Sequence, residues 1–350
     1  MNGNTRLLKL FNHLENLFSF LRVFSATISR GLRGHIDISK DTKKRIQDAA
    51  TEMGYRQNTF ASNLRKQKTD TIGVVLPELT SHFMSSVLAG IEKVTTKTGY
   101  DIIITHSSES YEKEVANVIN LFHKRVDGVI ASLASDTKNL NHFQRFIDKN
   151  VPIVFFDRVE EKDENLKVII DNYKGGYAAT QHLIDQGCKK IVLVTANLQR
   201  NVYAQRHNGY VDALAANNIE FDKNLVFIND LSEQSCIHAA KKVAKMDPCP
   251  DGAFITNDFS AVVFMNKIKE LGFKIPEDIA IVGFNDDTIS RMVKPQLTTI
   301  HYPGMEIGEI AASSLINHLN GSSDMKLTQT IMVKSELIIR DSSLKKIKND

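Results

Sequence analysis

Short runs of β-branched residues alternate with amphipathic stretches of helical length from Thr71 onward. Gly99, Gly187 and Gly272 stand where helices of this pattern should stop. The alternation predicts an α/β fold built on parallel sheets. We expect strands at 71–77, 100–106, 127–133, 151–157, 190–196, 225–230, 252–258 and 279–286. We expect helices at 82–98, 111–125, 139–149, 173–187, 203–217, 232–246, 259–272 and 303–319.

Eight strand–helix units fit two sheets of ordinary size better than one wide sheet, so we expect two lobes, with the last strand of the first lobe ending near Asp157. Ligands of open α/β sheets bind at the carboxyl ends of strands. Polar residues follow the strands there: Asp157, Arg158, Asp171, Asn172, Asn257, Asp258, Asn285, Asp286 and Asp287. Their carboxylates and amides suit a polyhydroxylated ligand. Ordinary capping of the following helices is the alternative at each position.

Two short helical stretches precede this region. Residues 25–30 (SATISR) start a helix with a hydroxyl residue, and Ser39 opens a second one whose apolar face carries Ile46, Ala49, Ala50 and Met53. Two helices with a basic outer face can place one helix in the major groove of DNA, where Arg reaches base edges. A solvated helical hairpin is the alternative.

Positive charge is concentrated at this end of the chain. Residues 1–69 hold 13 Lys/Arg against 5 Asp/Glu, a net charge of +8, whereas the remainder holds 31 against 36, a net charge of −5. A basic module on a mildly acidic body is what binding to DNA phosphates requires, and a basic but inert tail is the alternative.

The remaining composition argues against several other classes of protein. The three cysteines form neither a CxxC pair nor a Cys/His cluster, so we expect a reducing, cytoplasmic location, no disulfide framework and no metal site. The apolar stretch 7–24 is interrupted by charged residues and lacks a cleavage site, so we expect neither export nor a membrane span. Without a phosphate loop or a Ser/His/Asp arrangement, we expect no enzyme and no cofactor.

The order of motifs along the chain resembles the LacI/GalR (lac-repressor) family. The run SATISRGL…ISKDTKKRIQDAATEMGYRQNTFASNLRKQKTDTIGVVLP is similar to that family's recognition helix, third helix, hinge helix and first effector-domain strand. The similarity continues through VPIVFFDR, QRHNGYVDAL, ITNDFSAV, PEDIAIVGFNDD and PQLTTIHYP, the last of which would carry the chain back into the first lobe. The resemblance implies a helix-turn-helix joined to a two-lobed domain of the periplasmic-binding-protein type.

The resemblance also implies domain limits and site residues. It places the helix-turn-helix at 1–57, the hinge helix and linker at 58–69, and the effector and dimerisation domain at 70–350, with lobe 1 at about 70–170 and 299–350 and lobe 2 at about 171–298. Base contacts fall to Ser25, Ala26 and Arg30, and backbone contacts to Thr27, Ser29, Tyr55 and Asn58. Ala61 and Leu64 lie in the hinge helix, with Leu64 entering the minor groove. Effector contacts fall to Ser81, His82, Phe83, Asp157, Arg206, Asn257, Asp258 and Asn285.

Upstream of Val23 the chain departs from the family pattern. Phe18 stands where a small alanine would let two helices approach, and Arg22 and Phe24 crowd the turn. Overpacking of this kind costs about 1–3 kcal/mol, so we hypothesise a weakened first helix. An altered start in the source sequence and a true divergence with repacking both explain it.

Together these features predict a dimeric DNA-binding repressor. Its partners would be operator DNA, a second copy of the chain and a small effector, a carbohydrate or sugar phosphate, bound between the lobes. The alternative is a non-exported sugar-binding protein with impaired DNA binding. A surface arginine and a strand-end aspartate are the plainer interpretations of Arg206 and Asp157.

Overall fold

The computed structural model describes residues 23–32, 34–52 and 68–345. It divides into two compact units, Met1–Thr69 and Asp70–Asp350. In the first unit, α2 (Ser25–Leu32) packs on α3 (Lys40–Glu52) through Ile28 and Ile46, which are both fully buried. Gly31 permits this approach, because a Cβ there would lie 2.4 Å from the Ile46 side chain. The expected helix pair is therefore present.

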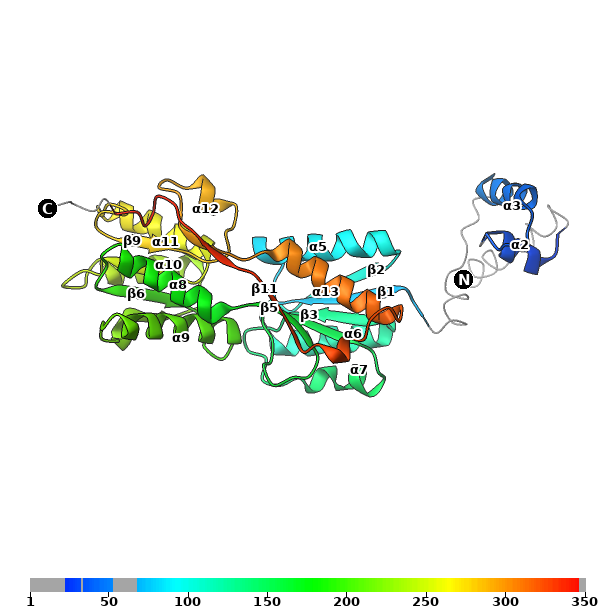
Figure 1. The fold of residues 1–350 in the computed structure, drawn as a ribbon, viewed down its shortest axis with the longest axis horizontal. Coiled ribbons are helices and arrows are strands. Elements are labelled where there is room, and N and C mark those ends of the chain that lie inside the picture. The colour runs from blue at the N-terminus through cyan, green and yellow to red at the C-terminus, as the bar shows by residue number, and fades with distance from the viewer. Residues whose placement is uncertain (1–22, 33, 53–67, 346–350) are drawn as a thin grey trace, which may run out of the picture. The chain divides into compact units, whose positions relative to one another are not determined.

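The second unit contains two parallel sheets (Figure 1). The first has the order β11-β5-β4-β3-β1-β2, and the second has the order β7-β6-β8-β9. The expected two-lobed α/β fold is confirmed. Lobe 1 contains β1 (Thr71–Leu76), α5 (His82–Thr98), β2 (Asp101–His106), α6 (Tyr111–Lys124), β3 (Gly128–Ala131), a 3-10 turn (Asn141–Phe143), α7 (Gln144–Asp148), β4 (Ile153–Phe156), β5 (Leu166–Ile170), α13 (Gly304–Leu319), a 3-10 turn (Met325–Leu327) and β11 (Thr330–Val333).

Lobe 2 repeats the architecture on a smaller sheet. It contains α8 (Asn172–Asp185), β6 (Ile191–Thr195), α9 (Asn201–Ala216), a 3-10 turn (Lys223–Leu225), β7 (Val226–Ile228), α10 (Glu233–Val243), β8 (Gly252–Ile255), α11 (Asp258–Glu270), β9 (Ala280–Val282) and α12 (Ile289–Met292). The antiparallel pair β10 (Thr299–His301) and β12 (Glu336–Ile338) lies on the segments that run between the lobes.

Alternating residues of each buried strand face opposite helical layers. In β1, Val74 packs towards α5 and α13, whereas Val75 packs towards α6 and α7. In β6, Leu193 packs towards α8 and α9, whereas Val194 packs towards α10 and α11. Because both faces are covered, these strands appear in the sequence as continuous apolar runs.

The eight expected strands are all present, but the sequence missed β5, β10, β11 and β12. The first lobe therefore does not end its sheet near Asp157, since β5 and β11 extend it. The helix expected at 139–149 is reduced to a 3-10 turn and the short α7. Gly99, Gly187 and Gly272 have positive φ at 77°, 85° and 94°, as expected of helix stops.

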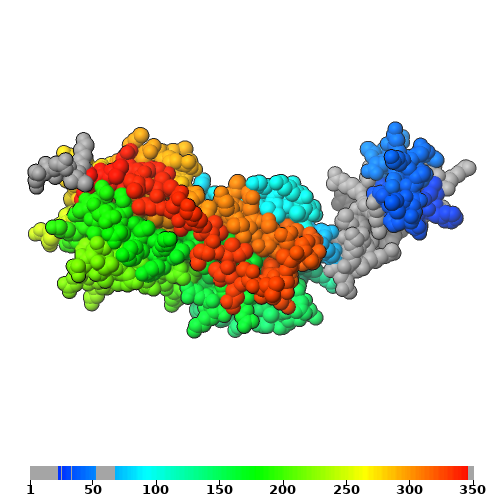
Figure 2. All heavy atoms as spheres, in the orientation of Figure 1, coloured from blue at the N-terminus to red at the C-terminus, as the bar shows by residue number. Residues whose placement is uncertain are grey.

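The end of the chain corrects one lobe boundary. The sequence places residues 299–350 in lobe 1, but within the described part of this stretch lobe 1 holds α13, the 3-10 turn Met325–Leu327 and β11. Beyond β12, Ser342 accepts a hydrogen bond from the Ile281 amide (2.8 Å), and Arg340 pairs with Asp286 at 2.6 Å, both in lobe 2. In Figure 2 the C-terminal segment, coloured red, runs along the surface of both lobes. The return to lobe 2 depends on pairing between distant segments, which no local pattern reveals.

Candidate functional site

The carboxyl ends of the strands from both lobes meet around Tyr302, which directly follows β10. Its ring lies 4.2 Å from that of Phe83 in lobe 1 and 6.2 Å from that of Phe284 in lobe 2. Its hydroxyl donates a 2.8 Å hydrogen bond to Asp157 at the end of β4. Tyr302 therefore joins side chains from both lobes. It stands in the run PQLTTIHYP but was not among the effector contacts expected from the sequence.

Arg206 is the cationic centre on the lobe 2 side. It lies on α9, only 3% exposed, with its guanidinium carbon 3.6 Å from the centre of the Phe284 ring. Its Nε donates to the Asn172 side chain (2.9 Å) and its Nη1 to the carbonyl of Thr256 (3.0 Å). These bonds hold the plane of the guanidinium in one orientation. Burial lowers the pKa of Arg206, against the opposing influence of Tyr302 and Tyr203.

Asp157 is held in a conformation unusual for its residue type. Its φ is 55°, in the left-handed region that costs a non-glycine residue about 1–3 kcal/mol. Burial raises the pKa of this carboxyl, against the lowering influence of Arg158 and Arg206. Strain and desolvation at one side chain are typical of a binding site more than of a simple strand end.

Other predicted effector residues make contacts within the chain. Ser81 caps α5, its hydroxyl accepting from the Met84 amide, and Asn257 caps α11 by accepting from the Ser260 amide. Capping, the alternative considered for such residues, is thus observed at Asn257. Asn285 has a φ of 125°, and its carbonyl accepts from the Tyr302 amide.

Asp258 is fully buried and serves the loop that follows β9. Its carboxylate oxygens accept from the Thr299 hydroxyl (2.6 Å) and the Asp287 amide (2.8 Å). Burial, and then the neighbouring Asp287, raise its pKa to about 8. The side chain therefore holds β10 against the 285–287 turn.

His82 makes a second connection between the two lobes. It begins α5, and its ring nitrogens lie 3.3 Å from an Asp287 carboxylate oxygen and 3.0 Å from the Thr288 hydroxyl. Burial alone would raise the pKa of the neighbouring Asp286 carboxyl. Hydrogen bonds from His301 and Arg340 outweigh this effect and lower the pKa to about 2. Asp286 thus faces Arg340 and His301, whereas the carboxyl that faces His82 is that of Asp287, whose pKa is raised by burial.

In the first unit, the predicted DNA contacts lie along α2. Ala26 and Arg30 are exposed, and Thr27 and Ser29 are half-buried. The predicted residues Tyr55, Asn58, Ala61 and Leu64, and the atypical residues 1–22, lie outside the described residues. Ser39 accepts a 3.2 Å hydrogen bond from the Thr42 amide and so caps α3, as the sequence predicted.

Among the described residues, no group of three or more His, Cys, Asp or Glu side chains is arranged to hold a metal ion. No helix within the same part of the chain is long and apolar enough to cross a membrane.

Comparison with known proteins agrees with this architecture. A model of the periplasmic binding protein-like domain matches residues 180–343. Catabolite control protein A of Priestia megaterium is 30% identical over 299 residues, which cover 85% of this chain and 90% of that protein.

Solved structures extend the agreement. The lac repressor dimer bound to operator and the anti-inducer ONPF has a TM-score of 0.83 at 22% identity, covering 94% of this chain and 98% of that chain. A periplasmic binding protein/LacI transcriptional regulator from Alkaliphilus metalliredigens, complexed with D-xylulofuranose, has a TM-score of 0.68 at 25% identity, covering 79% and 100%. The chain belongs to the LacI/GalR family of transcriptional regulators, and its second unit is the periplasmic-binding-protein-like, ligand-binding domain of that family.

Proposed function

We propose that this regulator is a repressor whose operator affinity is controlled by a carbohydrate or sugar phosphate bound in the cleft around Tyr302. The observation that carries this proposal is the fixed guanidinium of Arg206, which faces Tyr302 and lies within the same aromatic cluster as Phe83. Planar donors beside aromatic faces suit a ring with vicinal hydroxyls on its edge and C–H groups on its face. The relative from Alkaliphilus metalliredigens, which carries D-xylulofuranose, supports the same class of ligand.

A thermal-shift screen of the full chain tests the effector class. Sugars and sugar phosphates are added singly, and a true ligand present at 100 times its Kd should stabilise the folded state by about 2.7 kcal/mol. Arg206→Met should abolish the shift, whereas Arg291→Met, at an exposed arginine of lobe 2, should preserve it. If Arg206→Met does not fold, Asn285→Ala replaces it. A screen of carbohydrates without a single hit would contradict the proposal.

We further propose that α2 reads base edges in the major groove of operator DNA. The exposed side chains of Ala26 and Arg30, together with the basic charge of this end of the chain, support that placement. Selection from random duplex DNA would identify the site. Arg30→Ala should then weaken binding by about 1–3 kcal/mol and relax specificity at one base pair. Arg145→Ala, at an exposed arginine of α7, should leave binding unchanged.

The atypical start of the chain gives this DNA proposal a separate test. A gel shift compares the natural chain with a variant whose residues before Val23 follow the family pattern. We expect the variant to bind more tightly, because Phe18 would no longer overpack the first helix. Equal affinities would contradict the hypothesis of a weakened helix. Adding the effector to the same assay shows whether it releases DNA or promotes binding.

We propose that the active form is a homodimer. An apolar groove flanks β2 at one edge of the first sheet, and a more polar groove flanks β7 at one edge of the second. These two strands expose Ile104 and Ile228, respectively. Exposed apolar edges of this kind are usually covered by a partner. A second copy is the occupant favoured by the lac repressor dimer, whose fold this chain shares. Ile104→Asp should shift the mass measured by light scattering from dimer to monomer, and an unchanged dimer would exclude this face.

A further inference from the structure

The start of α9 in lobe 2 is bonded directly to two loops of lobe 1. Arg200 donates from Nη2 to the carbonyl of Thr137 at 2.7 Å. Asn201 donates to the carbonyl of Asp157 (3.1 Å) and accepts from the amide of Val159 (3.0 Å). Both side chains are more than nine-tenths buried. Protein groups thus join the lobes on this side of the cleft.

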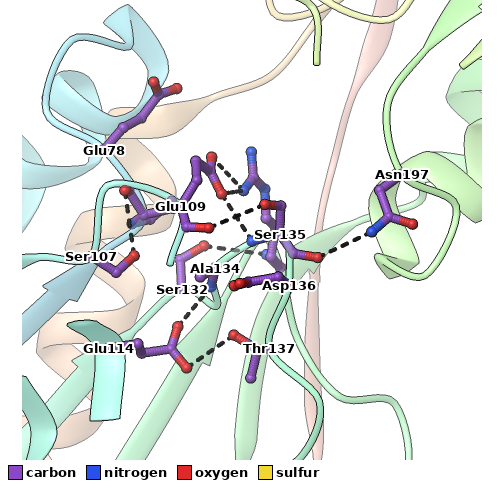
Figure 3. Close-up of polar contacts among 12 residues, drawn as sticks. Glu78, Ser107, Glu109, Glu114, Ser132, Ala134, Ser135, Asp136, Thr137 and Asn197 are labelled. Carbon is purple, nitrogen blue, oxygen red and sulfur yellow. Dashed lines mark hydrogen bonds and ion pairs between the residues drawn. The ribbon is translucent and has the colours of Figure 1, made fainter. Parts of the chain in front are cut away.

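The loop that receives Arg200 is fixed from inside lobe 1. Residues 132–137 follow β3, and Glu114 of α6 accepts hydrogen bonds from the Ala134 amide (2.6 Å) and the Thr137 hydroxyl (3.0 Å) (Figure 3). Glu114 is fully buried, and His142 Nε2 lies 2.8 Å from its carboxylate. A buried carboxylate with several donors is a rigid support, so the Thr137 carbonyl is presented to lobe 2 in one position.

A second carboxylate fixes the same loop closer to the cleft. Glu109 accepts from the Ser135 amide at 2.8 Å, and the Ser135 carbonyl accepts from Asn197 of lobe 2 at 3.4 Å (Figure 3). The backbone at Glu109 is left-handed, with a φ of 60°, as it is at Ser108, where φ is 51°. Such backbone costs free energy and persists where the surroundings over-determine it.

Glu109 also orients a cation towards α9. Both of its carboxylate oxygens accept from Nη1 of Arg158 at 2.7 Å, and Nη2 of Arg158 donates to the Tyr203 hydroxyl at 3.3 Å. One carboxylate therefore supports two contacts between the lobes.

We propose that loop 132–137 and the start of α9 form a latch that sets how far the lobes close before an effector binds, with Glu109 and Glu114 as its positioning residues. This rests on the proposed function, in which closure of the cleft controls operator affinity. The latch bonds stabilise the closed arrangement independently of ligand contacts. The apparent affinity for an effector then depends on the fraction of molecules that the latch holds closed.

Hydrogen–deuterium exchange of the full chain tests the latch across the cleft. Arg200→Met removes a donor from lobe 2, and we expect amides of loop 132–137 in lobe 1 to exchange about ten-fold faster. Arg200→Lys keeps a cationic donor and should restore part of the protection. Reciprocally, Glu114→Gln in lobe 1 should accelerate exchange in the first turn of α9. Arg291→Met is the control and should leave loop 132–137 unchanged.

The location of the change decides the outcome. Faster exchange confined to the lobe that carries the substitution would overturn the latch, because a purely local role moves only local amides. If Arg200→Met fails to fold, Asn197→Ala removes a less buried donor of lobe 2 instead. Faster exchange in loop 132–137 is again the expected result. The measurement needs no effector, so a failed sugar screen would contradict the effector proposal without affecting this result.

Discussion

Asp258, beside the 285–287 turn, is a side chain whose protonation the fold alters. Its ordinary pKa of 3.8 is raised to about 8 by burial and by Asp287. Between these two values the folded chain holds a proton that the unfolded chain has released. The stabilising contribution of the protonated carboxyl is therefore fully present below about pH 4 and is lost as the pH rises through about 8.

Asp258→Asn should remove this pH dependence, because an amide does not ionise. We expect the melting temperature of the natural chain to fall by several degrees more than that of the variant between pH 5 and pH 8. Melting curves at intervals of one pH unit measure the difference. Asp101→Asn, at an exposed position, should retain the natural slope. Parallel slopes for the natural chain and Asp258→Asn would show that the carboxyl is already ionised at pH 5.

The residue scale also shows what the sequence could predict of the site. Polar residues after strands pointed to Asp157 and Asn285, and the family pattern pointed to Phe83 and Arg206. Tyr302 was missed because its role depends on where two lobes meet. No spacing along the chain encodes its contact with Asp157, which is 145 positions away.

Among the elements, the pair α8 and α9 depends on close backbone approach. A Cβ at Gly209 would lie 2.2 Å from the Tyr173 carbonyl oxygen and 2.5 Å from the Tyr177 amide nitrogen. Those atoms belong to the backbone of α8, so they cannot move aside without separating the helices. Because α9 carries Arg206 and the latch residues, its position against α8 fixes one wall of the cleft.

Gly209→Ala should destabilise the second unit by about 1–3 kcal/mol, the usual range for overpacking. Urea denaturation measures this change. Asn208→Ala, at the adjacent exposed position, is the control and should be neutral or slightly stabilising, because alanine favours helix. An unchanged midpoint for Gly209→Ala would mean that the two helices separate without cost.

The sequence predicted strands that have long apolar runs, and it missed short strands that lack them. Long apolar runs such as β1 and β6 are recognisable because both faces are buried. The missed strand β5 carries Lys167 within its short run, and β10 and β12 have three residues each. These strands form because they pair with strands that lie far away in the sequence or at the edge of a sheet.

For the whole molecule, each unit has its own apolar core. In its described part, the first unit has a small core cluster of Ile28, Ile46 and Ala49, and Ala50 is buried as well. In the second unit one apolar cluster is continuous from Ile72 of lobe 1 to Phe284 of lobe 2. A continuous core couples the lobes, so they should unfold together.

Calorimetry of the full chain should therefore show one cooperative transition for the two lobes, with the first unit melting separately at lower temperature. A fragment of residues 70–350 should reproduce the main transition at the same temperature. Two resolved transitions within that fragment would show that the lobes fold independently.

The sequence by itself determined the two-lobed α/β class, the helix pair at the basic end and the family, because these depend on local periodicity, charge and motif order. Only the tertiary structure decided the return of residues 340–345 to lobe 2, the place of Tyr302 between the lobes and the support of loop 132–137 by Glu109 and Glu114. Each of those depends on contacts between residues far apart in the chain, whose pairing is chosen by packing and hydrogen bonding after the elements have formed.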